Sequence, residues 1–170
     1  NLGVDIIEAG FAISSPGDFD AIKTIAENVK NSTIASLARA VKGDVDAALR
    51  ALDKANKKRV HIFLATSPLH REFKLKMSKQ EIIDRAYEAV TYAKGFIDDI
   101  EFSAEDAMRT EPEYLIEVFN AVIAAGATTL NVPDTVGYRT PTEIFERIKY
   151  LRENVKGIEN VDISTNLPYK

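Results

Sequence analysis

The sequence predicts an α/β fold of the (β/α)8 TIM-barrel type, in which parallel strands alternate with helices. Short β-branched runs recur about every 25 to 35 residues, and the segments between them carry apolar residues at the three- and four-residue spacing of a helix. Polar residues gather where the strands end, as they do in such barrels. About six strands are expected instead of the eight that close a barrel. We therefore expect residues 1–170 to form a single, incomplete barrel domain.

The first two units each begin with a strand. Residues 4–9 form a β-branched run that is too short for a helix and ends at Gly10. Apolar residues with helical spacing follow over residues 19–29. Residues 33–37 predict the second strand, and a helix follows over residues 43–52. The first two units are therefore strand, loop and helix.

The third unit contains the longest loop. Its strand is expected at residues 59–65, and its helix begins at a capping box in which Ser78 and Glu81 each satisfy the other's backbone N–H. Apolar residues continue this helix over residues 82–93, and residues 98–102 predict the fourth strand.

The last elements continue the alternation. A helix is expected at residues 112–126, opened by a proline and closed by a glycine, followed by a strand at residues 128–132. A helix at 141–154 and a strand at 161–164 complete the pattern. An open doubly wound sheet is the alternative, but residues 10–13 are no glycine-rich phosphate turn. The barrel is therefore favoured.

Composition excludes several classes of protein. The net charge is −4, and no basic cluster is longer than residues 57–59, so nucleic acid is not an expected partner. There are no cysteines, which removes disulfides and thiolate chemistry. No apolar stretch approaches the roughly 20 residues that span a bilayer, and the first residues show no basic region followed by an apolar one. We expect a cytoplasmic protein without a membrane partner.

The polar residues that follow or close predicted strands outline an active-site rim. The opposite connections, such as residues 125–127, are short and chemically plain. This asymmetry is typical of a barrel enzyme. The rim candidates are Glu8, Arg39, Thr66, Ser67, His70, Ser103, Glu105, Asp106, Asn131, Asp134 and Thr135.

Each rim segment has a second interpretation. Residues 66–77 suit anion capture with His70 as an acid–base group, or form a solvated basic connector. Glu105 is an acid–base candidate, or a carboxylate that precedes a helix. Residues 131–138 supply an amide, a carboxylate and a hydroxyl, or form a simple turn. His61, in the middle of a strand, is interpreted as structural.

Four motifs carry a resemblance to a known family. Residues 7–11, residues 63–70 with 74–77, residues 102–106 and residues 131–137 resemble the catalytic barrel of the 2-isopropylmalate synthase family, which also includes homocitrate and citramalate synthases. The likeness runs from the first residue to about Thr165. Each motif follows the strand that the family pattern requires.

The resemblance implies an acyltransferase that condenses acetyl-CoA with a 2-oxo acid. For a 2-isopropylmalate synthase the acceptor is 2-oxoisovalerate, at the entry to leucine biosynthesis. Glu105 would belong to the acid–base apparatus. The residues that would bind substrate are Glu8, Arg39, His70, Ser103, Asn131 and Thr135.

The resemblance also implies a divalent metal, Mg, Mn or Zn, in the parent enzyme. Its usual ligands are an aspartate that would precede Asn1 and a His-x-His pair where residues 166–168 are Asn, Leu and Pro. No metal ligand is therefore assigned here. We expect an incomplete copy of a 2-isopropylmalate synthase barrel that is inactive alone and belongs to a homo-oligomer, such as a homodimer.

Two alternatives stay open. The acceptor could instead be that of a citramalate or homocitrate synthase, because one or two methylenes give only about 1–3 kcal/mol of discrimination. The chain could also be a non-catalytic barrel remnant that self-associates through unpaired edge strands.

Overall fold

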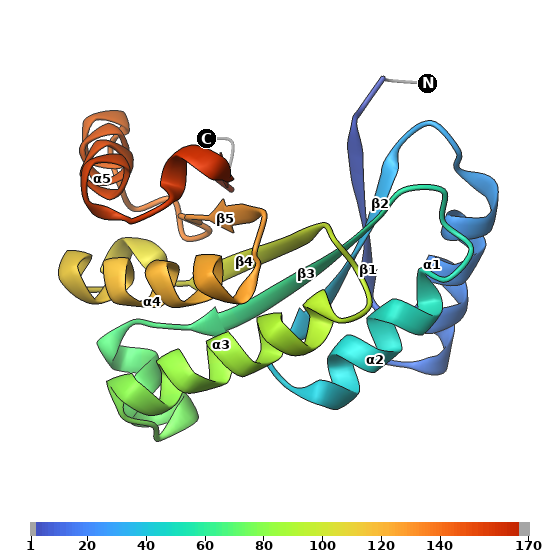
Figure 1. The fold of residues 1–170 in the computed structure, drawn as a ribbon, viewed down its shortest axis with the longest axis horizontal. Coiled ribbons are helices and arrows are strands. Elements are labelled where there is room, and N and C mark those ends of the chain that lie inside the picture. The colour runs from blue at the N-terminus through green and yellow to red at the C-terminus, as the bar shows by residue number, and fades with distance from the viewer. Residues whose placement is uncertain (1–2, 167–170) are drawn as a thin grey trace.

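The computed structural model describes residues 3–166, which form alternating strands and helices (Figure 1). The strands are β1 (Ile6–Phe11), β2 (Thr33–Arg39), β3 (Lys58–Ala65), β4 (Ile100–Glu105), β5 (Thr129–Asn131) and β6 (Asp162–Ser164). The α-helices are α1 (Pro16–Asn28), α2 (Lys42–Ala51), α3 (Lys79–Lys94), α4 (Pro112–Ala125) and α5 (Pro141–Asn154). Three short helices are η1 (His70–Leu75), η2 (Ala107–Arg109) and η3 (Ile158–Asn160). The predicted alternation is confirmed.

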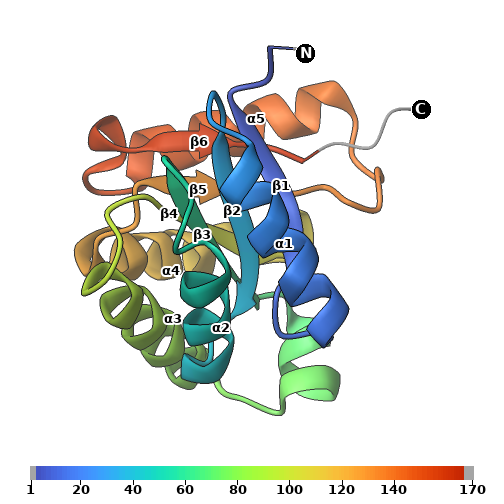
Figure 2. The same ribbon diagram turned by 90° about the vertical axis from the view of Figure 1, so that its right-hand side faces the viewer.

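All the strands belong to one parallel sheet in the order β1-β2-β3-β4-β5-β6. Each strand therefore pairs with its neighbours in the sequence, as crossover helices on one face require. Figures 1 and 2 show α1, α2, α3 and α4 side by side along one face of the curved sheet. The carboxyl ends of the strands consequently lie along one rim.

The apolar core fills the space between the sheet and the helices. Alternate residues of β3 and β4, including Ile62 and Phe102, are fully buried there. The helices contribute Ile82 and Phe119, which are also fully buried. The alternate side chains on the other face of the same strands are mostly polar, with Arg59 and His61 in β3 and Glu101 and Ser103 in β4, which leaves a largely polar inner face.

Two strands differ from the sequence prediction. β1 starts and ends two residues later than expected and passes through Gly10, whose φ of +138° is accessible to glycine but rarely to other residues. The pairing of β1 with β2 shifts between Glu8 and Phe11, so the strand continues past an irregularity. β4 was expected at residues 98–102 but runs over Ile100–Glu105, where it pairs with β3 from Val60 and Ile100 onward. Glu105 is therefore the last residue of β4.

The predicted helix ends are confirmed. Glu81 accepts from the Ser78 N–H at 2.7 Å, and the Ser78 hydroxyl oxygen accepts from the Glu81 N–H at 3.3 Å. Pro112 opens α4, and Gly126 ends it with φ +109°.

The long loop after β3 contains an element that the sequence pattern did not predict. η1 is a π-helix, and it ends at Lys76, whose φ is +54°. Single π turns often occur at functional sites. None of the helices in residues 3–166 has the length and apolar character needed to cross a membrane.

Candidate active site

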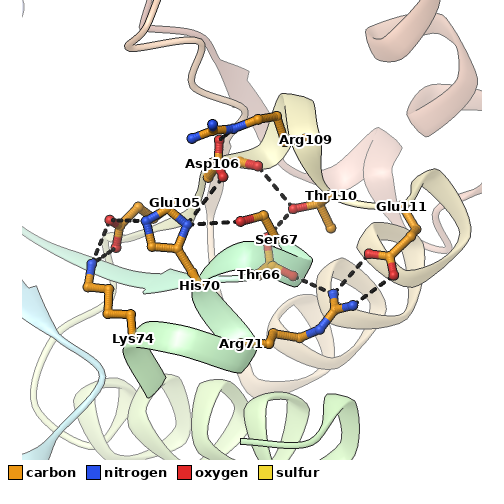
Figure 3. Close-up of polar contacts among 10 residues, drawn as sticks. All are labelled: Thr66, Ser67, His70, Arg71, Lys74, Glu105, Asp106, Arg109, Thr110 and Glu111. Atoms are coloured by element: carbon orange, nitrogen blue, oxygen red, sulfur yellow. Dashed lines mark hydrogen bonds and ion pairs between the residues drawn. The ribbon is translucent and has the colours of Figure 1, made fainter. Parts of the chain in front are cut away.

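His70 lies between two carboxylates at the rim (Figure 3). Its Nδ1 atom is 3.2 Å from Oδ2 of Asp106 and 2.9 Å from the Ser67 hydroxyl. Its Nε2 atom is 3.7 Å from Oε1 of Glu105. Ser67 follows β3, whereas Glu105 closes β4, so neighbouring strand ends bring these groups together.

Glu105 is also paired with Lys74. The Lys74 ammonium lies 2.7 Å and 2.9 Å from the two carboxylate oxygens of Glu105. His70 and Lys74 both belong to η1, so one turn of π-helix presents two basic side chains to the end of β4. This arrangement places the Glu105 carboxylate, a possible proton acceptor, beside two basic side chains.

Asp106 has a left-handed backbone conformation, with φ +65°. Burial of its carboxyl group opposes ionisation, but hydrogen bonds from Arg109 and Ser67 outweigh burial, so the pKa of Asp106 is below its usual range. Arg109 Nε donates to Asp106 at 2.6 Å. Asp106 is therefore a fixed negative charge beside His70.

A cavity of about 660 Å³ opens beside these groups. Its lining includes His70, Glu105 and the exposed Thr135. Asp134 closes the turn after β5, because its carboxylate accepts the backbone N–H groups of Tyr138 and Arg139 at 3.3 Å and 2.9 Å. The turn interpretation therefore fits Asp134, whereas Thr135 faces the cavity.

A second polar group lies on the inner face of the sheet. His61 Nδ1 hydrogen-bonds with the Glu8 carboxylate, and His61 Nε2 is 2.6 Å from the Ser103 hydroxyl. His61 thereby connects the substrate-binding candidates Glu8 and Ser103. The sequence analysis interpreted His61 as structural and did not join it to the site. The alternation of Arg59 and His61 with buried apolar residues is the signal that could have found it.

Glu101 forms the other part of the inner group. It accepts from Asn131 Nδ2 at 3.0 Å, from the Ser164 hydroxyl at 2.7 Å and from Arg59 Nη1 at 3.1 Å. Burial raises the pKa of Glu101. The facing His61 and the three hydrogen bonds lower the pKa by a larger amount, so it lies below its usual range. Asn131 is consequently directed toward Glu101 on the inner face.

Arg39 stands apart from both groups. Its guanidinium forms a two-point ion pair with Asp44, with distances of 2.6 Å and 3.0 Å. It lines a separate cavity of about 420 Å³ that Lys74 and Glu105 also line. The predicted site residues therefore fall into two groups. His70, Glu105 and Thr135 form a rim group, and Glu8, Ser103 and Asn131 form an inner-face group. Arg39 belongs to neither group and lines the smaller cavity beside Glu105.

The described residues do not fit a metal by themselves. Within residues 3–166 no three His, Asp or Glu side chains are grouped so that they could hold an ion. Where the family pattern has a metal-binding His-x-His, this chain has Asn166 at the first position, and residues 167 and 168 lie outside the described residues.

Fold and site together define a class of protein. A parallel sheet with crossover helices and acid–base groups at the carboxyl ends of its strands is the arrangement of a (β/α)-barrel enzyme. The HMGL-like family matches residues 1–166. The chain belongs to the HMGL-like family.

Curated relatives in this family are named 2-isopropylmalate synthase. The protein of Pyrococcus furiosus is 56% identical over 165 residues, which are 97% of this chain and 33% of that protein. The 2-isopropylmalate synthase 1 of Caldanaerobacter subterraneus subsp. tengcongensis is 54% identical over 97% of this chain and 42% of its own length. The chain thus spans well under half the length of these relatives.

Solved structures share the fold. Hydroxymethylglutaryl-CoA lyase from Pseudomonas aeruginosa superimposes with a TM-score of 0.74 at 19% identity, over 97% of this chain and 56% of that chain. The lyase of Bacillus subtilis gives a TM-score of 0.73 at 17% identity, over 97% and 56% of the two chains. This likeness confirms the predicted fold of the (β/α)-barrel type, with six strands in the part of the chain that the structure describes.

Proposed function

We propose that this chain is part of the catalytic barrel of a 2-isopropylmalate synthase, which condenses acetyl-CoA with 2-oxoisovalerate in leucine biosynthesis. The observation that carries the proposal is the 56% identity over 97% of the chain to a relative of that name. The same proposal includes 2-oxoisovalerate as the acceptor, a homo-oligomeric assembly and a cytoplasmic location.

Glu105 is the proposed acid–base residue. Condensation requires a base that removes a proton from the methyl group of the thioester. The resulting carbanion attacks the keto carbon of the acceptor, the keto oxygen takes up a proton, and hydrolysis of the thioester by water then releases CoA. Glu105 suits this role because Lys74 contacts both of its oxygens and a cavity opens directly beside it. His70, 3.7 Å away, can exchange a proton with it or contact a substrate carboxylate.

The acceptor is proposed to lie between the rim and the inner face. Thr135 and His70 line the cavity beside Glu105 and can donate hydrogen bonds to a carboxylate. Ser103, Asn131 and Glu8 offer polar atoms on the inner face. The resemblance implies a divalent metal that would polarise the keto oxygen, but residues 3–166 contain no ligand set for it, so no step is assigned to it.

A hybrid enzyme tests the proposal. The matching 165-residue segment of the Pyrococcus furiosus synthase is replaced by the aligned residues of this chain, and release of CoA from acetyl-CoA is measured with added Mg²⁺, Mn²⁺ or Zn²⁺. We expect CoA release that depends on 2-oxoisovalerate and exceeds the rate with pyruvate or 2-oxoglutarate. A folded hybrid that prefers either of the other acceptors would contradict the proposal.

The 170-residue chain alone is the matched control. We expect no CoA release from it, because the residues that the structure describes hold no group of metal ligands. Metal-dependent turnover by the chain alone would overturn this expectation.

Self-association without catalysis is the second candidate function, and the sheet order favours it. Within residues 3–166, β1 and β6 each pair with a single strand, and Val4 and Ile6 beside the β1 edge are exposed. An uncovered edge can pair with another strand. Light scattering on the chain would give a defined dimer if this candidate is right, and a monomer if it is wrong.

A further inference from the structure

Glu105 and Asp106 are consecutive residues, and both of their carboxylates face the ring of His70 (Figure 3). Glu105 Oε1 lies 3.7 Å from Nε2 of the ring, and Asp106 Oδ2 lies 3.2 Å from Nδ1. Successive residues of a strand point to opposite faces of its sheet, so a regular continuation of β4 would separate the two carboxylates. The left-handed backbone of Asp106, with φ +65°, breaks this alternation. One carboxylate therefore faces each nitrogen of the ring.

The turn after β4 is held in this conformation by arginines from a later part of the chain. Arg147 donates to the carbonyl oxygens of Ala107 and Thr110, at 3.3 Å and 2.9 Å. Arg139 donates to the carbonyl oxygen of Met108 at 3.0 Å. A left-handed backbone is unfavourable for residues other than glycine, although aspartate and asparagine tolerate it, and such backbone strain gathers at functional sites. The position of Asp106 therefore calls for a functional explanation.

Asp106 determines which nitrogen of His70 carries the proton. Arg109 Nε donates to Oδ1 of Asp106 at 2.6 Å, a contact that favours the ionised carboxylate. An ionised carboxylate can only accept hydrogen bonds, so its contact with Nδ1 requires a proton on that nitrogen. The Ser67 hydroxyl, 2.9 Å from Nδ1, can accept from it as well. The neutral ring then has its lone pair on Nε2, which is the nitrogen nearer to Glu105.

This tautomer has a consequence for the reaction, and the step rests on the proposed function. Glu105 takes a proton from the methyl group of the thioester, and an unprotonated Nε2 can accept that proton from Glu105. The proton can then pass from Nε2 to the oxygen that carries the negative charge after attack on the keto carbon. The Asp106 carboxylate stabilises the imidazolium between the two transfers. His70 can donate to a substrate oxygen from Nε2 only after it has taken up this proton.

We propose that Asp106, held by Arg109, is a positioning residue that keeps the proton of His70 on Nδ1 and leaves Nε2 open to receive a proton from Glu105. Asp106 acts through His70 and does not itself touch the reacting atoms. The alternative is a structural role, in which Asp106 pairs with Arg109 only to close η2. A structural role predicts that the tautomer of His70 does not depend on the Asp106 carboxylate.

Nitrogen NMR of the imidazole ring measures the tautomer directly. The chain contains two histidines, so two sets of ring signals are expected, and the set that His70→Ala removes belongs to His70. In the unsubstituted 170-residue chain, at a pH where both rings are neutral, we expect the His70 proton on Nδ1. A proton on Nε2 in this chain would overturn the proposal without the need for any variant.

Asp106→Asn is the informative substitution, because asparagine also tolerates the left-handed backbone. Arg109 requires the remaining oxygen of the new amide, so the amide nitrogen faces Nδ1 and donates to it. We expect the His70 proton to move to Nε2, and the signals of His61 to stay unchanged. Asp98→Asn, at a fully exposed carboxylate before β4, is the matched control. An unchanged His70 tautomer in an Asp106→Asn chain that circular dichroism shows to be folded would contradict the proposal.

The hybrid enzyme connects the tautomer to the reaction. Asp106→Asn should lower kcat for 2-oxoisovalerate-dependent CoA release by about ten- to a hundredfold with little change in KM, because a histidine in the wrong tautomer cannot accept the proton. Asp98→Asn should leave both constants unchanged. A change of tautomer with an unchanged kcat would reject the positioning role.

The two measurements separate this inference from the proposed function. An active hybrid whose His70 has its proton on Nε2 would reject the inference and leave the function intact. The expected tautomer, and its change in Asp106→Asn, in a chain whose hybrid releases no CoA would keep the control of His70 by Asp106 and reject the function.

Discussion

Lys74 contacts both carboxylate oxygens of Glu105, at 2.7 Å and 2.9 Å, and so joins η1 to the end of β4. The side chains are 51% and 33% exposed, so the pair contributes little to folding stability, about 0–1 kcal/mol. Its importance lies in the position and charge of Glu105.

Replacing Lys74 should therefore affect catalysis more than stability. In the hybrid enzyme, we expect Lys74→Met to lower kcat by about ten- to a hundredfold, because a misplaced acid–base group is costly. Lys74→Arg should recover part of the loss, and Lys54→Met, at an exposed pair with Asp53, is the control. An unchanged kcat and pH profile for Lys74→Met would contradict this role.

The two histidines should differ in their effect on stability. His61→Ala leaves Glu8 and Ser103 without their shared buried partner, so we expect a loss of about 1–3 kcal/mol in the free energy of unfolding. His70→Ala removes a partly exposed side chain and should cost less. Urea denaturation measures both variants, and equal losses would argue against a buried connection through His61.

Glu111 should make stability depend on pH in acid. Hydrogen bonds from Arg71 are the main cause that lowers the pKa of Glu111 from 4.5 to about 2. Because the folded pKa is lowered, the stabilisation is complete above pH 4.5 and is lost as pH falls toward 2. Thermal melting of the chain and of Glu111→Gln should show a Tm difference that shrinks over this window; a constant difference would contradict it.

Two glycines should respond to alanine in opposite directions. Gly126 ends α4 with φ +109°, and an added Cβ would lie 3.0 Å from the Lys94 side chain, so we expect Gly126→Ala to cost about 1–2 kcal/mol. Gly43 is the second residue of α2, and nothing lies within 4 Å of an added Cβ, so Gly43→Ala should stabilise by up to about 0.5–1 kcal/mol. Urea denaturation decides, and losses of equal size would refute the conformational argument.

Local patterns were sufficient to predict most of the fold. Helical spacing, the Ser78–Glu81 capping box and the glycine after α4 depend on residues close in sequence, and all are confirmed. The strand shifts at β1 and β4 depend instead on pairing with a neighbouring strand. Pairing register is a tertiary property that a single run of residues does not determine.

The candidate site was only partly predictable for the same reason. The rim followed from polar residues at strand ends, but its pairs join distant positions: His61 and Ser103 are 42 residues apart, and Glu101 and Ser164 are 63 apart. The π-helix that places Lys74 beside Glu105 has no clear sequence signal. The roles of Glu8, Arg39, His70, Ser103, Glu105, Asn131 and Thr135 stay predictions.

The kcat of the hybrid enzyme with Glu105→Gln tests the central claim most directly. Glutamine keeps the size of the side chain but removes the proton acceptor, so we predict at least about a hundredfold lower rate of 2-oxoisovalerate-dependent CoA release, with little change in KM. A folded Glu105→Gln hybrid with undiminished kcat would contradict the assignment of acid–base chemistry to this rim.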